Sequence, residues 1–400
     1  MKITTLELTA RDPIVSRDGR PFGAGQGNRM RSVDWPLPSV IAGSLRTALG
    51  KTAGKDFSLE TAAELQQVSV SGVFPVANNQ LYLPSPQDCV VHPSRGPLPA
   101  MPIEINDGGC DLPHPGLRPV MFDQPTDEDD FKPKAPPAWW PIADYVKWLS
   151  GSSVTLNEDF LLAPEQEDRT HVKMDADAGV GSDGELFTTT GLALDHLRRY
   201  FDSKWSETQC RSFADRYAEI RLATRVASDG WCAEQVSNLD GHFPTGGERR
   251  LIHWKANANA AIWSCPDTIR SALQRAEKVR MVLTTPSIFR DGWKPGWLND
   301  ELVGSPPGSD VQLQLVGTTI QRWRAISGWS LARINDQGQL DPHGRPGPKP
   351  IRRMVPAGGV YFFSVVSGNS ASLSDCWQRS VCDEEQNQRD GFGLATWGIW

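Results

Sequence analysis

Apolar and polar residues alternate along several short stretches of the chain, and this two-residue period predicts β-strands. The pattern occurs at residues 5–10, 220–226, 278–283 and 311–315, where successive side chains would point to opposite faces of a sheet. A mostly apolar run at 361–366 predicts a strand that is buried on both faces. We therefore expect a chain that is rich in short strands.

Three other segments have the spacing of an amphipathic helix. The first covers residues 39–50, with Pro38 at its start and Gly50 at its end. Residues 142–149 predict a short helix that packs its aromatic side chains inward, and residues 186–205 predict a further helix.

The order of these elements favours an α+β fold. No regular βαβ rhythm is visible, so a doubly wound parallel sheet is not expected. A length of 400 residues predicts two domains, and we place them at 1–205 and 206–400. Residues 84–140 are rich in proline and glycine and carry an acidic run, so we expect an irregular, partly mobile insertion there.

Composition excludes several classes of protein. No stretch approaches the roughly 18 apolar residues of a membrane-spanning helix, and the N-terminus lacks the apolar run of a signal peptide, so we expect a cytoplasmic protein. The 7 cysteines are scattered without a CxxC pair, which argues against a disulfide framework or a zinc site. A net charge of −7 argues against binding nucleic acid through bulk charge, but it does not exclude a local basic groove.

Motifs for cofactors and metals are incomplete. Gly50-Lys51-Thr52 resembles the end of a phosphate-binding loop, but Leu45 stands where the first glycine is required. Gly23-Ala24-Gly25-Gln26-Gly27 lacks the third glycine of a dinucleotide site. The histidines show no paired ligand spacing, and the acidic clusters at 127–130 and 383–385 fit solvated surfaces better than metal sites. We therefore expect no cofactor, no metal and no catalytic constellation.

Glycines and arginines precede the first predicted helix. Arg17, Gly19 and Arg20 lie in a turn-rich loop, and the helix that starts at Ser39 carries Arg46. Free amides at a helix start, close to arginines, can bind a phosphate. A surface turn with an ordinary helix cap is an equally good interpretation.

A second candidate lies at 169–175. Alternation there places Val172 and Met174 inward and shows His171 and Lys173 on the opposite face, as on a sheet that contacts RNA. An exposed histidine without a function is the simpler alternative.

Two further glycine-containing loops could approach a ligand closely. Gly246 and Gly247 precede Arg249 and Arg250, which could reach a phosphate, although a plain hairpin turn would look the same. Aromatic residues at 285–295 could stack on unpaired bases or simply fill a loop. The chain ends with Gly391-Phe392-Gly393 before an apolar strand.

Taken in order, these segments resemble the RAMP-type subunit of the Cmr module in type III-B CRISPR–Cas, the subunit that caps the guide end. The insertion at 84–140 lies outside the resemblance. The pieces that carry it are Arg17-Asp18-Gly19-Arg20-Pro21-Phe22, Trp35-Pro36-Leu37-Pro38-Ser39, Gly43-Ser44-Leu45-Arg46-Thr47, His171-Val172, Asp183-Gly184-Glu185-Leu186-Phe187, Gly246-Gly247-Glu248-Arg249, Thr285-Pro286, Gly292-Trp293, Lys349-Pro350, Ala357-Gly358-Gly359-Val360-Tyr361-Phe362 and Gly391-Phe392-Gly393.

The resemblance implies tandem ferredoxin-like (RRM-like) RAMP domains with long loop insertions. It also implies a non-catalytic protein that binds the 5′ repeat-derived handle of crRNA, docks on the large cyclase-type subunit and contacts the RAMP backbone subunits. The candidate RNA-binding residues are Arg17, Gly19, Arg20, Ser39, Arg46, His171, Lys173, Gly246, Gly247, Arg249, Arg250, Gly391 and Gly393.

Two alternatives stay open. One is a metal-independent RAMP endoribonuclease that processes crRNA with His171 as general acid or base and Lys173 as the cation beside the phosphate. The other is an unrelated ligand-binding protein that stacks sugars on some of its 15 tryptophans.

Overall fold

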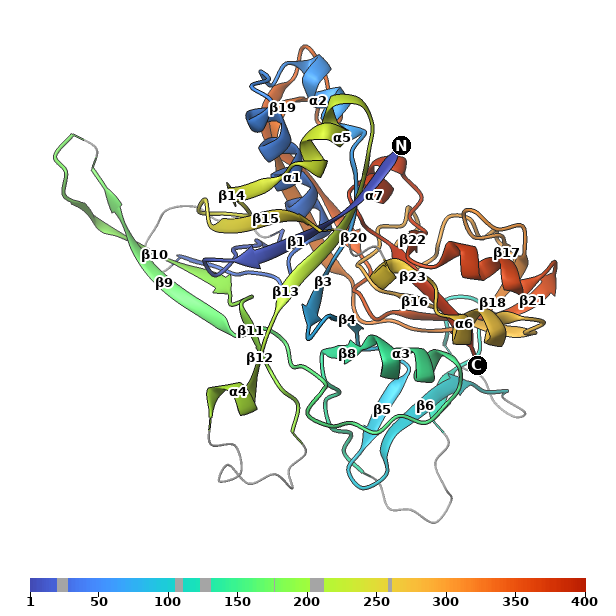
Figure 1. Cartoon of the computed structure of the whole chain (residues 1–400). Coiled ribbons are helices and arrows are strands. Elements are labelled where there is room, and N and C mark those ends of the chain that lie inside the picture. Colours follow the sequence, from blue (N-terminus) through green and yellow to red (C-terminus); the bar gives the residue numbers. More distant parts are fainter. Residues whose placement is uncertain (20–27, 105–110, 123–130, 176, 202–211, 258–260) are drawn as a thin grey trace.

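A computed structural model of the chain is shown in Figure 1. It describes residues 1–19, 28–104, 111–122, 131–175, 177–201, 212–257 and 261–400. The fold is α+β, with many strands and few helices, as the sequence predicts. Among the described residues, no helix is both long and apolar enough to cross a membrane.

The first sheet is antiparallel and has seven strands in the order β14-β15-β1-β13-β3-β4-β8. Strand β1 lies between β13 and β15, with Leu6 opposite both Thr224 and Ala256. The helices α1, α2 and α5 belong to this part of the molecule, and α1 and α5 contact each other and the sheet. These elements are β1 (Lys2–Ala10), α1 (Pro38–Thr52), α2 (Leu59–Gln66), β3 (Ser69–Ala77), β4 (Gln80–Pro84), β8 (Trp139–Pro141), β13 (Arg221–Ser228), α5 (Gly230–Ser237), β14 (Asp240–Pro244) and β15 (Leu251–Asn257).

The second sheet is also antiparallel and has six strands in the order β17-β18-β21-β16-β23-β22. The helix α6 and the 3-10 helix η2 contact each other and β23. These elements are α6 (Asp267–Leu273), β16 (Lys278–Leu283), β17 (Val303–Gly304), β18 (Gln312–Thr319), β21 (Val360–Ser367), η2 (Ser370–Cys376), β22 (Arg379–Ser380), α7 (Glu385–Arg389) and β23 (Leu394–Ile399). A further 3-10 turn, η1 (Ala261–Trp263), precedes α6.

The two sheets arrange their four main strands in the same way. In the first, the chain order β1, β3, β13, β15 becomes the spatial order β15-β1-β13-β3. In the second, the chain order β16, β18, β21, β23 becomes β23-β16-β21-β18. Strands from both sides of residue 205 share the first sheet, and the domain division at 205 stays a prediction.

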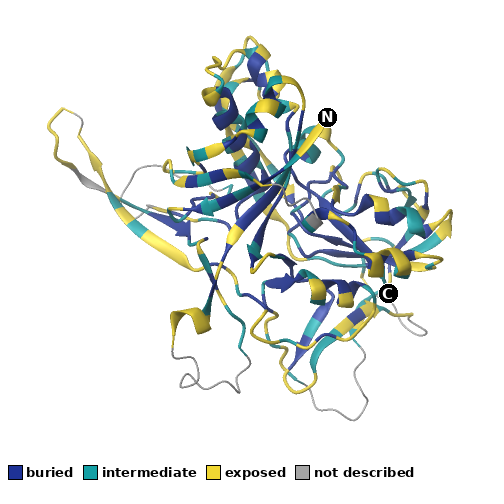
Figure 2. Ribbon diagram, in the orientation of Figure 1, coloured by how far each residue is buried: buried dark blue, intermediate teal, exposed yellow. Residues whose placement is uncertain are grey.

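Two hairpins extend from the sheets, each placed in the chain between the second and third main strands of its sheet (Figure 1). One is β9 (Gln166–Met174) with β10 (Gly181–Leu192), which also pairs with the short strand β2 (Asn28–Met30). The other is β19 (Arg324–Ile334) with β20 (Arg345–Met354). Figure 2 shows that much of the β9–β10 hairpin is exposed, whereas the two sheets are largely buried.

The predicted strands at 5–10, 220–226, 278–283, 311–315 and 361–366 are confirmed as β1, β13, β16, β18 and β21. The predicted helices at 39–50 and 142–149 are confirmed as α1 and α3 (Ile142–Leu149).

The predicted helix at 186–205 is wrong. Its described part contains the end of β10 and strand β11 (His196–Arg198). Strand β11 pairs with β12 (Tyr217–Glu219), which follows the short helix α4 (Phe213–Arg216). Leu192, Leu194 and Leu197 are all buried, so the apolar spacing that suggested a helix belongs to an extended segment passing through the core.

The segment 84–140, expected to be irregular, contains a three-stranded sheet in its described part. Its strands are β5 (Cys89–His92), β6 (Gly96–Pro102) and β7 (Val120–Phe122). An ion pair with almost no solvent exposure fixes the segment to the second sheet: Asp88 is 0% exposed and lies 2.5 Å from the guanidinium of Arg280. Trp148 of α3 donates its indole N–H to the same carboxylate.

Candidate functional site

The loop that follows β1 is held by backbone pairing to two other candidate segments. Ile14 bridges to Leu192 at the end of β10, and Val15 bridges to Gly247. Gly246 has φ +73°, and a side chain there would place its Cβ 2.3 Å from the Val15 carbonyl oxygen. Glycine is therefore required at 246 because two backbones touch, whatever else binds nearby.

The start of α1 is fixed by the same loop. The hydroxyl of Ser16 accepts a hydrogen bond from the Leu37 N–H, and the Ser32 hydroxyl donates to the Thr190 carbonyl. Leu37 is the N-cap residue and no side chain caps the helix. Ser39 lies in its first turn and is partly exposed, and Arg17 pairs with Ser32 through an isolated bridge.

The second candidate segment is β9, and its predicted facing is wrong. Val172 is 44% exposed and Met174 is 54% exposed, because none of the described segments covers them. His171 stacks on Phe187 of β10, and its Nε2 lies 2.9 Å from the hydroxyl of Thr189. Lys173 is exposed on the same strand.

At the base of this hairpin Asp168 links the strands of the small sheet. It accepts a hydrogen bond from the Thr190 hydroxyl at 2.6 Å and pairs with Arg29 of β2. The hydrogen bond from Thr190, followed by the bond and charge of Arg29, lowers the pKa of this carboxyl.

The terminal glycine loop is buried between the two sheets. Gly391 has φ +90°, and a Cβ there would lie 2.4 Å from the carbonyl oxygen of Val70 in β3. The Thr285 hydroxyl donates to the Gly391 carbonyl and accepts from the Leu394 N–H. Gly393 has φ +69°, with the Cys382 sulfur 2.6 Å from where its Cβ would be. Gly391 thus lies at a close contact with the first sheet, and Gly393 at one with the segments that follow β16 and β22.

Arg46 is also used inside the protein. Its side chain is 12% exposed, and its guanidinium pairs with Asp390 at 2.5 Å and donates to the carbonyls of Val68 and Arg389. Arg249 is exposed, whereas Arg250 is partly buried and its Nε has no hydrogen-bond partner among the residues that the structure describes. Gly19 packs closely on Ala325 of β19, and Arg20 lies outside the described residues.

A small apolar cluster joins these segments, and we call the region around it the junction. It links the loop before α1, the segment after β16, both strands of the β19–β20 hairpin and the terminal glycine loop. Its buried members are Val33, Leu37, Ile288, Ile326, Met354, Cys382 and Phe392. No pattern in the sequence predicts this cluster, because its residues are too far apart in the chain.

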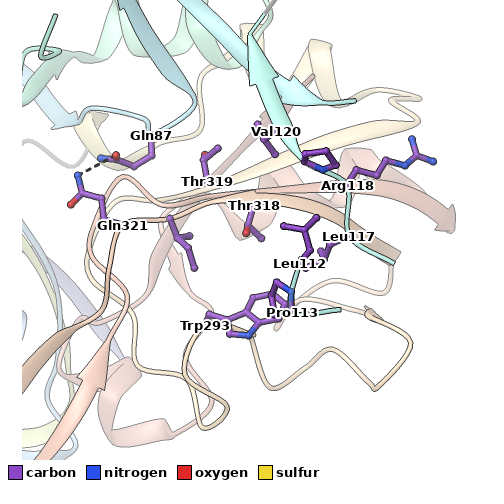
Figure 3. A pocket seen from close by; sticks show the side chains of 12 residues that line it. Gln87, Leu112, Pro113, Leu117, Arg118, Val120, Trp293, Thr318, Thr319 and Gln321 are labelled. Atoms are coloured by element: carbon purple, nitrogen blue, oxygen red, sulfur yellow. Dashed lines mark hydrogen bonds between the residues drawn. The ribbon is translucent and has the colours of Figure 1, made fainter. Parts of the chain in front are cut away.

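One cavity adjoins the junction, and a second cavity shares a wall residue with it. A cavity of about 170 Å³ is lined by Trp35, Trp139 and Pro286, together with Arg324 of β19. A larger one, about 600 Å³, lies between β18 and residues 112–120 (Figure 3). Gln321 lines both cavities and donates a hydrogen bond to the Gln87 side chain.

In the larger cavity, the indole of Trp293 lies with Leu112 and Pro113 on one side, and Arg118 lines its rim (Figure 3). Trp293 belongs to the aromatic stretch 285–295, for which the sequence predicts either base stacking or a loop-filling role. Within the described residues, no group of three or more histidine, cysteine or acidic side chains is arranged to hold a metal ion.

Several solved structures are similar to this chain. A chain of the type III-B Cmr-beta complex bound to cognate target RNA has a TM-score of 0.45 and 12% identity, covering 90% of this chain and 86% of that chain. The same complex bound to target RNA and AMPPnP gives 0.44 and 12%, with the same coverage. A chain of the Csm3-Csm4 subcomplex of the type III-A interference complex gives 0.34 and 9%, covering 91% of this chain and 95% of that chain. No curated protein matches the sequence.

The model of one protein family, described as CRISPR-associated protein (Cas_Cmr3), matches residues 6–400. The match covers nearly the whole chain, including the insertion at 84–140, which the motifs had left outside the resemblance. The protein therefore belongs to the Cas_Cmr3 family and is a RAMP-type Cmr subunit of type III-B CRISPR–Cas, as its ordered motifs imply.

Proposed function

We propose that this protein is the non-catalytic subunit of a type III-B effector complex that binds the 5′ handle of crRNA. In this proposal it docks on the large cyclase-type subunit and contacts the RAMP backbone subunits, in the cytoplasm. The observation that carries the proposal is the junction, where segments separated by hundreds of residues meet.

The chemistry of the junction suits single-stranded RNA. Arg17, Arg31 and Arg249 are exposed around it and can contact phosphates, although the chain as a whole is acidic. Single-stranded RNA is bound through splayed bases, backbone contacts and stacking, which a local site can provide without a basic domain.

We divide the predicted RNA-binding residues into two groups by their exposure. Gly391, Gly393 and Arg46 are buried in protein contacts, and we assign them a supporting role. We keep the others as RNA-contact candidates; all of them except Arg20, which lies outside the described residues, are at least partly exposed. These are Arg17, Gly19, Arg20, Ser39, His171, Lys173, Gly246, Gly247, Arg249 and Arg250.

The tandem ferredoxin-like arrangement is part of the proposal. Both sheets have the same order of four main strands, and the first places α1 and α5 in the β-α-β-β-α-β sequence of that fold. The first unit would then extend past the predicted boundary at 205 to the end of β15, and the second would start near β16.

The test is a binding assay with the full chain, alone and in complex with the large subunit. Labelled handle RNA should bind more tightly than unrelated RNA of equal length, with an affinity that falls as salt rises. Equal affinity for both RNAs in the assembled complex would refute handle recognition.

The endoribonuclease alternative has a separate test. His171 is held by Thr189 and Phe187, and no observation favours a catalytic role for it. We expect repeat RNA to remain intact when it is incubated with the wild type or with His171→Ala. Cleavage by the wild type that His171→Ala abolishes would establish the enzyme instead.

A further inference from the structure

The β19–β20 hairpin is strongly basic in an acidic protein. Residues 322–354 contain seven arginines and lysines against two aspartates, Asp336 and Asp341. The cations are Arg322, Arg324, Arg333, Arg345, Lys349, Arg352 and Arg353. The whole chain has a net charge of −7, so this charge is concentrated on one element.

The base of the hairpin is attached to the junction. Ile326 and Met354 are buried in its apolar cluster, and Arg324 pairs with Asp34 in the loop before α1. Arg352 donates to the Asn387 side chain of α7 at 2.7 Å and lies 3.7 Å from Glu384. These contacts place the hairpin beside α1 and α7.

Lys349 lies on the face of the hairpin that is turned towards Arg46 and Asp390, and it forms no ion pair within the described residues. Within the part of the chain that the structure describes, its ammonium group has no hydrogen-bond or ion-pair partner. Loss of solvent lowers its pKa, Asp390 opposes that shift, and Arg46 and Arg352 add to it. Lys349 is only partly exposed, and an ammonium group that loses part of its solvent without gaining a partner is disfavoured; a bound anion would relieve that cost.

The strand opposite Lys349 carries no side chain at the paired position. The partner of Lys349 across the hairpin is Gly328, which has no side chain, and even a Cβ there would remain 3.6 Å from the lysine chain.

The outer side of the hairpin carries exposed aromatic rings. Trp329 is 66% exposed and lies one residue from Gly328, so it points to the opposite face from Lys349. At the start of the hairpin Trp323 is 47% exposed, and the Arg353 guanidinium lies 4.9 Å from its ring. Exposed aromatic rings beside cations are the elements of a surface for single-stranded nucleic acid.

We propose that the β19–β20 hairpin binds single-stranded RNA, with a backbone phosphate at Lys349 and Arg352 and an unpaired base stacked on Trp329. The inference deepens the proposed function and rests on it, because the hairpin would extend the RNA surface of the junction. The excess of positive charge and the unpartnered lysine favour RNA over an apolar protein partner for this surface.

The test measures binding of labelled single-stranded RNA to the full chain at several salt concentrations. Lys349→Met should weaken binding and lower the slope of log affinity against log salt by about 0.7, the value for one phosphate contact on a single strand. Lys349→Arg should restore most of the slope. Lys147→Met, which removes an exposed lysine of α3, should change neither quantity.

Trp329→Ala should weaken binding by about 5- to 150-fold, the range for one stacked base, and leave the salt slope unchanged. Trp329→Phe should retain most of the affinity. Binding of duplex RNA of the same sequence should not respond to Trp329→Ala, because its bases are already stacked.

The outcomes separate this inference from the proposed function. If the wild type prefers handle RNA while all hairpin variants keep its affinity and salt slope, the hairpin inference is wrong and the proposed function stands. If the wild type shows no handle preference, the proposed function fails, and the hairpin inference fails with it. If the variants instead lose association with the large or backbone subunits at unchanged RNA affinity, the hairpin is a protein interface and the inference is overturned.

Discussion

Asp88 and Arg280 offer the sharpest test of how the insertion is held to the second sheet. Their side chains are 0% and 3% exposed, and the charged groups lie 2.5 Å apart. Arg280 also donates to the carbonyl of Trp148, so one guanidinium connects β16, α3 and residue 88. Asp88→Asn would remove the negative charge and keep the size of the side chain.

The expected cost follows from the charge that remains. Breaking a buried ion pair by removing one partner costs about 3–5 kcal/mol, because the other charge stays buried without compensation. For a unit of about 150–250 residues, each kcal/mol lowers Tm by about 2–4 °C. Asp88→Asn should therefore lower Tm by roughly 6–20 °C.

Thermal unfolding followed by circular dichroism measures this shift, and two variants serve as controls. Asp144→Asn removes an exposed ion pair with Lys147 on α3 and should cost no more than about 1 kcal/mol. Replacing both buried partners, Asp88→Leu with Arg280→Met, should recover most of the lost stability, since no charge is then buried alone. Equal Tm values for Asp88→Asn and Asp144→Asn would refute the reasoning.

Two further predictions concern backbone and pH. Gly391→Ala should lower the free energy of unfolding by several times as much as Gly54→Ala, as measured by thermal unfolding. Both glycines have positive φ, but only at 391 would a Cβ collide with the Val70 carbonyl. Equal losses of stability in the two variants would contradict this. The lowered pKa of Asp168 means that its contribution to stability is present above the unfolded pKa of about 3.9 and is lost as pH falls through the folded value. Thr190→Val should raise that pKa towards its usual value in an NMR titration, and an unchanged titration would show that the hydrogen bond has little effect.

Local patterns predicted most of the elements but not their partners. The strand at 5–10 alternates because one face of its sheet is buried, and that signal lies within a few residues. The strand at 278–283 is buried on both faces, with Arg280 paired to Asp88, so its alternation identified a strand but not an exposed face. The helix expected at 186–205 failed because buried leucines in an extended segment can imitate helical spacing. The facing of β9 failed because alternation predicts an inner face only where another layer covers the strand.

At the candidate site, local sequence patterns likewise fail to report which distant residues a constrained residue contacts. Gly246 and Gly391 stand beside basic or aromatic residues in the sequence, and both have positive φ angles, which favour glycine. Their partners, the carbonyl groups of Val15 and Val70, lie more than 200 residues away in the chain, and no local pattern reports them. The sequence therefore predicted which residues are constrained but could not separate a constraint of packing from one of RNA contact.

That separation changes which residues an RNA-binding experiment should address. A glycine or arginine used in packing will weaken RNA binding when mutated, since the junction it supports will lose its shape. Arg46 and Gly391 belong to this class, and their variants should lose stability and affinity together. An exposed side chain such as Trp329 or Arg249 has few protein contacts to lose, so its variants should change affinity at constant Tm. Measuring both quantities for each variant is what can assign RNA contact to a residue, and the exposed hairpins and the rim of the junction are where such residues should be found.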